Sequence, residues 1–438
     1  MTLFTKMASA LILLLFLIYV SGCSENFSAD EAFEKGIASA IEGSLEDAGA
    51  QFESALESDP FHERARVCLK IIKDFRAGNI DKTVGISVFK GIAAQNNGQF
   101  EEAIGEYNKA IEINPDYANA YNNRGLAYIS SGQFEQAVQD YLKALETNPV
   151  YAEAYNNRGY ARYFTGQLDL AISDYNKAVE ILPDWPIAYN NRGLAHINKG
   201  QFDLAIADFN KALEIHPGWA LAYNNRGITY NNMGEQDLAL ADFEKAIEID
   251  SMDAEAYNNR GLAYSAKGQH DLAIANFDKA LEISPEYAEA HHYRGVSYYI
   301  TAQQNLEKAA ANYSKAIEIN PNFAEAYNLR GILYSDKNLY DRAIPDFNQA
   351  IQIQPGFAAA YINRGLAFEN RGQYEFAIAD LNKAIELNPM DPKAYSARGV
   401  IYMVKLGNQA KACADFKKAC ELGDCQHYNI SKERGQCK

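Results

Sequence analysis

The sequence predicts an all-α solenoid, a fold in which short helical hairpins stack in a row. A block of the form A-x-A-Y-N-N-R-G recurs every 34 residues, the length of one helix-turn-helix unit. Such units bury their apolar faces only against their neighbours, so the period determines the architecture. Glycine and alanine recur in phase with the block, and prolines recur where the second helices should end. The blocks open at Ala118, Ala152, Pro186, Ala220 and Ala254, with looser copies at Ala288, Ala324, Ala358 and Pro392.

The residues inside one period resemble those of a known family. Between two prolines the chain reads Tyr121, Gly125, Tyr128, Ala137, Tyr141, Ala144 and Pro149. This order of aromatic, small and proline residues resembles the tetratricopeptide repeat (TPR) pattern. The resemblance implies a right-handed superhelix whose first helices line an inner, concave wall. Weaker copies around Gly91 and Gly36 extend the array to a total of eleven units.

The pattern divides the chain into five segments. We expect a signal peptide at 1–22, a lipidated tether at 23–28, a degenerate repeat with a connecting helix at 29–83, an array of about ten repeats at 84–426 and a C-terminal cap at 427–438. The stretch from Glu63 to Thr83 is either an extra helix or a decayed hairpin. Two added residues near Gln303 and Gln304, and one near Lys405, fall at predicted turns, where a solenoid tolerates insertions.

The N-terminus has the features of an export signal. Its apolar run, residues 10–19, is short for a membrane span and has the length of a signal-peptide core. The run leads into Val20-Ser21-Gly22-Cys23, which resembles the lipobox of bacterial lipoproteins. That resemblance implies cleavage before Cys23 and its acylation, palmitate included, and several acyl chains anchor a protein stably. The alternatives are an uncleaved anchor, or an ordinary signal peptide with a chance cysteine.

The residue after the lipobox cysteine bears on the compartment. Ser24 follows Cys23, and in Gram-negative bacteria a residue other than aspartate there resembles the outer-membrane signal. We therefore expect a location in the cell envelope, anchored by lipid in the outer membrane and facing the periplasm.

Composition and motifs argue against several functions. The formal net charge is −16, so the repeat surface is acidic and unsuited to nucleic acid. The seven histidines lack the spacing of metal ligands. The chain contains no nucleophile elbow, and no glycine loop opens a helix after a strand. We therefore expect no enzyme activity, no metal and no cofactor.

Four cysteines gather at the C-terminus, where a solenoid needs a cap. An oxidising compartment favours disulfides over the alternative of a zinc site. Cys413 and Cys420 lie seven residues apart on one predicted helix, about 10.5 Å, which is too far to bond each other. Their positions favour Cys420 with Cys425 and Cys413 with Cys437. We expect Cys68 to be an ordinary apolar residue of a helix.

An arginine column occupies a slot where the family pattern has leucine. That slot faces inward, so each guanidinium needs a partner. An aspartate or asparagine stands about sixteen residues after each arginine, which favours a structural ladder over a ligand-facing row. The ladder residues include Arg124, Arg158, Arg192, Arg226 and Arg260, with Asp140, Asp174, Asp208 and Asp242.

An asparagine column follows the first helices. It resembles the asparagine ladder in the tetratricopeptide domain of O-linked N-acetylglucosamine transferase. An amide both donates and accepts, so such a row can pair with the backbone of an extended peptide. The alternative is that these residues only satisfy contacts between helices. The peptide-binding candidates are Asn123, Asn157, Asn191, Asn225, Asn259 and Asn363.

These observations predict a protein-interaction scaffold or adaptor. It would be anchored by lipid and would bind peptide segments of envelope partner proteins in its concave groove. One alternative setting is assembly of a pilus or secretion apparatus, which genomic neighbours would reveal. An alternative of another class is a carrier or sensor for a small ligand.

Overall fold

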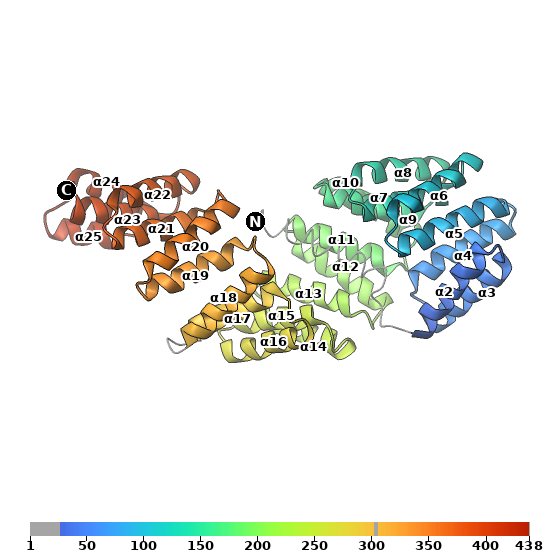
Figure 1. The fold of residues 1–438 in the computed structure, drawn as a ribbon, viewed down its shortest axis with the longest axis horizontal. Coiled ribbons are helices and arrows are strands. Elements are labelled where there is room, and N and C mark those ends of the chain that lie inside the picture. Colours follow the sequence, from blue (N-terminus) through green and yellow to red (C-terminus); the bar gives the residue numbers. More distant parts are fainter. Residues whose placement is uncertain (1–26, 302–304, 438) are drawn as a thin grey trace. The chain divides into compact units, whose positions relative to one another are not determined.

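The computed structural model describes residues 27–301 and 305–437, and within these ranges every regular element is a helix (Figure 1). The expected signal peptide, the lipidation candidate Cys23 and the added residues near Gln303 lie outside the described residues. Among the described helices, none has both the length and the apolar character that crossing a membrane requires.

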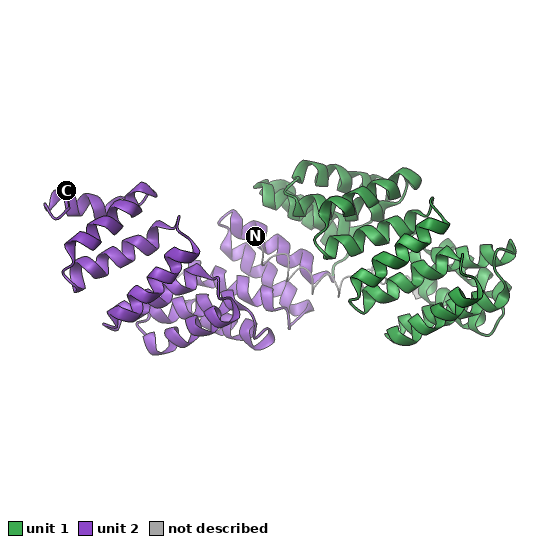
Figure 2. Cartoon of the chain, turned by 90° about the horizontal axis from the view of Figure 1, so that it is seen from above, with its two compact units in different colours: residues 1–251 green, residues 252–438 purple. Residues whose placement is uncertain are grey.

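The chain divides into two compact units, residues 1–251 and 252–438 (Figure 2). The division falls inside the array expected at 84–426. In unit 1 six hairpins and one single helix, α4, follow one another. The helices of unit 1 are α2 Phe27–Ile41, α3 Leu45–Ser58, α4 Glu63–Arg76, α5 Lys82–Asn96, α6 Phe100–Ile113, α7 Ala118–Ser130, α8 Phe134–Thr147, α9 Ala152–Phe164, α10 Leu168–Ile181, α11 Pro186–Asn198, α12 Phe202–Ile215, α13 Ala220–Met233 and α14 Gln236–Ile249.

Unit 2 contains five hairpins and a final helix. Its helices are α15 Ala254–Ala266, α16 His270–Ile283, α17 Ala288–Thr301, α18 Leu306–Ile319, α19 Ala324–Asp336, α20 Tyr340–Ile353, α21 Ala358–Asn370, α22 Tyr374–Leu387, α23 Pro392–Val400, the π-helical turn η2 Ile401–Lys405, α24 Gln409–Glu421 and α25 Gln426–Glu433. Each hairpin thus consists of a first and a second helix, and the names "first helix" and "second helix" are used in that sense below.

A glycine of the first helix packs against an aromatic ring of the second helix in every hairpin but α21–α22, where Leu381 takes the place of the ring. In the α13–α14 hairpin, a Cβ placed on Gly227 would lie 2.7 Å from Cε1 of Phe243. The Phe243 side chain is only 1% exposed, so the ring has little room to move away. Only glycine allows the two helices to approach this closely, which explains the glycine column of the repeat.

Most first helices are followed by a residue in the left-handed conformation. Gly200, between α11 and α12, has a φ of 70°, a value that costs glycine little. In the α19–α20 hairpin Asn338 takes this place with a φ of 58°. Asparagine tolerates the left-handed region better than most residues, so the turn is kept without glycine.

The last repeat absorbs its extra residue within the first helix, not in the turn where the sequence placed it. Residues 401–405 form a single π-helical turn at the end of α23. A π turn holds one more residue than an α turn, so the chain after it returns to register. Arg398 consequently still reaches Asp415, with Nε 2.9 Å from Oδ2, although these two residues are seventeen apart.

Helix α25 caps the end of unit 2. Two disulfides hold it, Cys413–Cys437 and Cys420–Cys425, which are the pairs that the sequence favours. The His427 ring also stacks on Phe416, with centroids 5.4 Å apart. Tyr428 of α25 also packs against the buried cluster of Ala412, Phe416 and Cys437.

Candidate functional site

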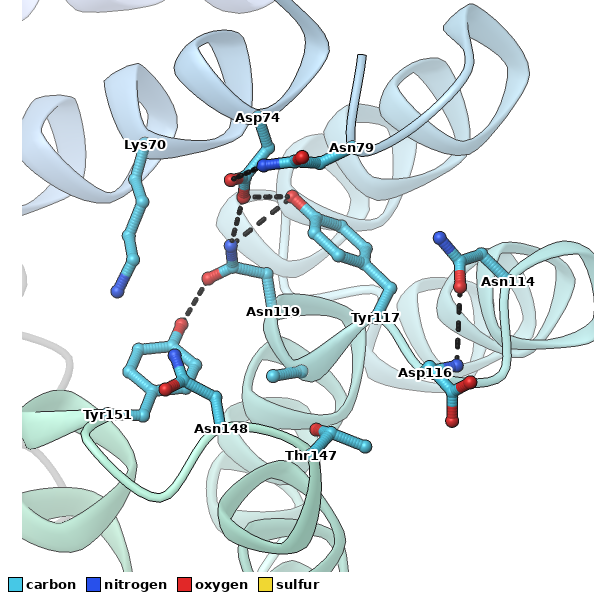
Figure 3. A pocket seen from close by; sticks show the side chains of 11 residues that line it. Lys70, Asp74, Asn79, Asn114, Asp116, Tyr117, Asn119, Thr147, Asn148 and Tyr151 are labelled. Carbon is cyan, nitrogen blue, oxygen red and sulfur yellow. Dashed lines mark hydrogen bonds between the residues drawn. The ribbon is translucent and has the colours of Figure 1, made fainter. Parts of the chain in front are cut away.

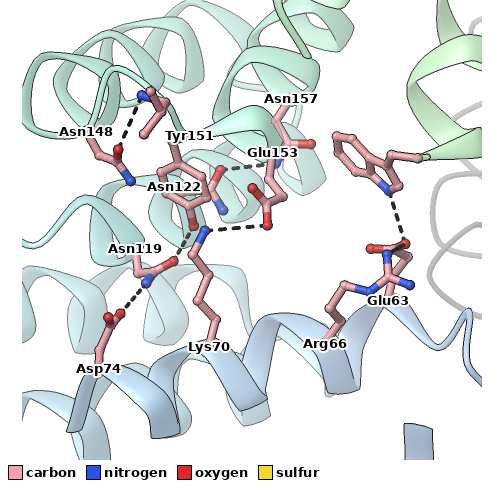
Figure 4. Close-up of polar contacts among 12 residues, drawn as sticks. Glu63, Arg66, Lys70, Asp74, Asn119, Asn122, Asn148, Tyr151, Glu153 and Asn157 are labelled. Atoms are coloured by element: carbon pink, nitrogen blue, oxygen red, sulfur yellow. Dashed lines mark hydrogen bonds and ion pairs between the residues drawn. The ribbon is translucent and has the colours of Figure 1, made fainter. Parts of the chain in front are cut away.

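The segment at 63–83, left open by the sequence, forms the single helix α4, and this helix lies across the starts of three first helices (Figure 4). Its apolar side belongs to the core of the neighbouring hairpins, where Cys68 and Ile72 are at most 1% exposed. Burial raises the pKa of the Cys68 thiol far above its usual range, so this cysteine is unreactive. The opposite side of α4 carries charged residues that contact α7, α9 and α11.

The two ends of α4 are held by hydrogen bonds to different repeats. The Asp74 carboxylate accepts hydrogen bonds from the Asn119 amide at 2.9 Å and from the Tyr117 hydroxyl at 3.1 Å, both at the start of α7. At the other end, the indole N–H of Trp185, just before α11, donates to Glu63 over 3.1 Å. Burial raises the pKa of the Glu63 carboxyl, and the indole N–H gives this buried group a hydrogen-bond partner.

Between these ends, a lysine is bound by an aromatic ring and a carboxylate. The Lys70 ammonium lies 3.8 Å from the centroid of the Tyr151 ring and 3.5 Å from Oε1 of Glu153. Tyr151 is 2% exposed under this contact, and burial raises the pKa of its hydroxyl well above the ordinary value. A cation over an aromatic face is stabilised by about 0.5–2 kcal/mol, depending on its desolvation.

The α4-binding face follows the repeat. It comprises Tyr117, Asn119, Tyr151, Glu153 and Trp185, and its three aromatic residues directly precede first helices at intervals of 34 residues. The α4 residues that meet them are four and seven positions apart, spanning about 16 Å of helix. The pattern of the sequence alone did not indicate this face. The available signal was an aromatic residue immediately before most of the repeat blocks.

A cavity of about 330 Å³ lies beside α4 and is lined by residues of this face (Figure 3). Asp74, Tyr117, Asn119 and Tyr151 point into it, and they form hydrogen bonds with one another. These four polar side chains therefore already have partners within the protein. This favours a role in holding α4 over the binding of a small ligand.

The arginine column forms the ladder expected from its spacing. The Arg226 guanidinium donates two hydrogen bonds to the Asp242 carboxylate, from Nε to Oδ2 at 2.8 Å and from Nη2 to Oδ1 at 2.6 Å. The two side chains are 19% and 8% exposed. The same two-bond contact joins Arg124 to Asp140, Arg158 to Asp174 and Arg192 to Asp208, whereas Arg260 donates to Asn276 through Nε.

The ladder also links neighbouring hairpins, a role that the arginine–aspartate spacing did not predict. Arg226 uses its third nitrogen, Nη1, to donate to Asn210 of the preceding hairpin at 2.5 Å. Arg192 contacts Asn176 in the same way at 2.8 Å. These asparagines stand sixteen residues before the arginines, so they could have been recognised by the same periodicity. Each such arginine therefore ties its own hairpin to the one before it.

The asparagine column lies between neighbouring first helices. Asn191 donates its amide to Asn156 at 3.0 Å, and Asn225 donates to Asn190 at 2.9 Å. Asn157 and Asn363 likewise donate to the asparagines 35 residues before them. The Asn123 amide donates to the backbone carbonyl of Asn119. Asn259 lies partly exposed on α15. Capture of a peptide backbone by this row stays a prediction, and it would require these inter-helix hydrogen bonds to open.

Family models of the TPR repeat and the tetratricopeptide repeat match residues 96–218, 229–287 and 300–422 in overlapping segments. The chain belongs to the tetratricopeptide repeat family. Proteins of this family are generally scaffolds for protein–protein interactions and not enzymes. No group of three or more His, Cys, Asp and Glu side chains that could hold a metal ion occurs in the described part of the chain.

Solved structures of tetratricopeptide proteins resemble parts of the chain. MamA protein is 31% identical and matches 39% of this chain and 94% of its own, with a TM-score of 0.35. YrrB, described as a TPR protein with an unusual peptide-binding site, is 28% identical over 43% of this chain and 97% of its own, with a TM-score of 0.36. A tetratricopeptide repeat protein from Parabacteroides merdae is 24% identical over 57% and 96%, with a TM-score of 0.44. No curated protein matches the chain.

Proposed function

We propose that this tetratricopeptide protein is a lipid-anchored scaffold of the cell envelope that binds peptide segments of partner proteins along its first helices. The observation that carries the proposal is α4. Three successive repeats hold this helix through one or two residues each, so the starts of the first helices are suited to binding a polypeptide segment. In unit 1 the chain's own helix occupies that surface, which leaves the first helices of unit 2 for partners.

A pair of leucines in one hairpin of unit 2 allows a direct test. A photoreactive amino acid would replace Leu262 on the first helix α15, or Leu272 on the second helix α16, where the side chain is 48% exposed. We expect covalent adducts with envelope proteins from position 262 and not from position 272, after irradiation of intact cells. Adducts from position 272 alone would move the binding surface to the second helices.

Anchoring is part of the same proposal and rests on the lipobox resemblance at Cys23. Replacing Cys23 by serine should leave the precursor uncleaved and abolish incorporation of labelled palmitate, because the serine hydroxyl does not replace the thiol that accepts the lipid. The measurement is metabolic labelling together with fractionation of membranes. A variant that still incorporates palmitate and fractionates normally would show that another residue carries the lipid.

A further inference from the structure

Unit 2 repeats the residue pair that binds Lys70 in unit 1. In unit 1, Tyr151 directly precedes α9, and Glu153 is the second residue of that helix. In unit 2, Tyr287 and Glu289 take the same places at α17, and Phe323 and Glu325 take them at α19. Two successive first helices of unit 2 therefore start with an aromatic ring and a carboxylate in the register that holds a lysine in unit 1.

The two carboxylates of unit 2 are available. Glu289 and Glu325 are partly exposed, and neither forms an ion pair or a side-chain hydrogen bond within residues 27–301 and 305–437. The Tyr287 ring is also partly exposed, in contrast to Tyr151, which Lys70 covers. Unit 2 thus presents an aromatic–carboxylate pair at the start of α17 without the cation that its counterpart in unit 1 holds.

Negative charge accumulates around these positions. Burial raises the pKa of the Tyr287 hydroxyl, and the carboxylates of Glu255, Glu289 and Asp253 raise it further. Burial likewise raises the pKa of the Tyr293 hydroxyl, with further increases from Glu289 and Glu325. Carboxylates of three successive first helices, α15, α17 and α19, therefore act on the same side of unit 2.

A buried polar group adjoins the same surface. The His292 ring lies 4.7 Å from the Phe323 ring between centroids, and its side chain is 6% exposed. Among the described residues, its Nδ1 has no hydrogen-bond partner. Burial lowers the pKa of His292 to about 4, so the ring is neutral at neutral pH and leaves the negative charge of the carboxylates uncompensated.

The helix that occupies the matching surface of unit 1 is basic, although the chain as a whole is acidic. Helix α4 carries five cations, Arg64, Arg66, Lys70, Lys73 and Arg76, against two carboxylates, Glu63 and Asp74. Three of the cations, Arg66, Lys70 and Lys73, are spaced by four and three residues, which places them on one side of the helix. Of these three, Lys70 contacts the carboxylate of a first helix, whereas Arg66 pairs with Glu63 of α4 itself.

We infer that the first-helix face of unit 2 binds a basic helix of a partner protein, with Glu289 and Glu325 contacting lysine or arginine side chains spaced as on α4. The inference rests on the proposed function and adds the chemistry of the partner. A helix fits because α4, a helix, fits the same register in unit 1. The exposed carboxylates then select cations, and the adjacent aromatic ring of Tyr287 stabilises the bound charge.

A labelled peptide based on α4 tests the inference. The probe is a fluorescein-labelled peptide of residues 61–78 with Cys68 replaced by serine, titrated with the full-length chain in detergent and followed by fluorescence anisotropy. We expect the double variant E289Q/E325Q to raise the Kd about tenfold or more, because two charge-assisted contacts are lost. Raising the NaCl concentration should weaken binding to the wild-type chain.

Two matched controls separate specific contacts from general attraction. The variant E282Q/E318Q removes the same charge from exposed positions on second helices of unit 2, and should change the Kd less than twofold. A probe with Arg66, Lys70 and Lys73 replaced by glutamine should bind weakly, and should lose little more affinity towards E289Q/E325Q. Circular dichroism melting of each variant checks that the repeats remain folded.

The outcomes distinguish this inference from the proposed function. Equal affinity of E289Q/E325Q and the wild-type chain, or equal weakening by both double variants, would overturn the inference. If position 262 gives partner adducts but E289Q/E325Q does not change the Kd of the probe, the scaffold function is supported. The proposal of a basic helix as the partner is then rejected. If the probe binds through the two glutamates but position 262 gives no envelope adduct, the first-helix face of unit 2 is supported as a binding surface for a basic helix. The proposed role as an envelope scaffold is then rejected.

Discussion

Replacing Arg226 by alanine is expected to lower the free energy of unfolding by about 3 kcal/mol. The substitution leaves the Asp242 carboxylate, 8% exposed, without the two hydrogen bonds that compensate its burial. It also removes the bond from Nη1 to Asn210 of the preceding hairpin. Urea unfolding followed by circular dichroism should therefore show a clearly lower midpoint.

Two control variants separate the loss of an exposed ion pair from the loss of the buried two-bond contact. Lys245→Ala breaks an exposed ion pair with Glu248 in the same hairpin, and should leave the unfolding midpoint nearly unchanged. Arg226→Lys keeps the charge but loses the planar two-bond contact, so its midpoint should fall between the other two. An Arg226→Ala midpoint equal to that of Lys245→Ala would show that the ladder contributes little to stability.

The same glycine-to-alanine substitution is expected to have opposite effects at two helical positions. Gly227→Ala should destabilise the protein by about 1–3 kcal/mol, because the new Cβ would lie 2.7 Å from the buried Phe243 ring. Gly105→Ala, in the interior of α6, meets no atom within 4 Å and should stabilise by about 0.5–1 kcal/mol, since alanine favours the helix.

Urea midpoints of the two variants, compared with the wild-type chain, decide this prediction. The pair is matched in chemistry, and the two sites differ only in what surrounds the new methyl group. A stabilising Gly227→Ala would mean that the α13–α14 hairpin opens at little cost. Close approach of the two helices would then not be the reason for the glycine column.

The repeat itself could be predicted from the sequence because its determinants are local. Gly227 and Phe243 are sixteen residues apart, and a glycine–aromatic contact of this kind recurs in every hairpin but α21–α22, so the periodicity indicates it directly. The Arg226–Asp242 pair has the same separation and was recognised for the same reason. The residues of the cap were also close enough in sequence for helix geometry to limit the possible disulfides.

The position of α4 could not be predicted in this way. Its bonds join residues far apart, such as Glu63 and Trp185, which are separated by 122 residues, and they occur once and not in every repeat. The asparagine column was ambiguous for another reason. An amide suits a peptide backbone and a neighbouring amide equally well, so the sequence could not reveal that Asn191 would pair with Asn156.

The long separation within the α4 contacts has a consequence for the order of folding. In a solenoid each hairpin can close as soon as it is made, since its partners are its neighbours. Helix α4 is an exception, because the hydrogen bond of Glu63 can form only after Trp185 has been synthesised, 122 residues later. At about 5–20 residues per second of synthesis, the delay is on the order of 10 s. The repeats from α7 to α11 can therefore stack before the bond between Glu63 and Trp185 forms, so the last contact of α4 is made after its neighbouring repeats are in place.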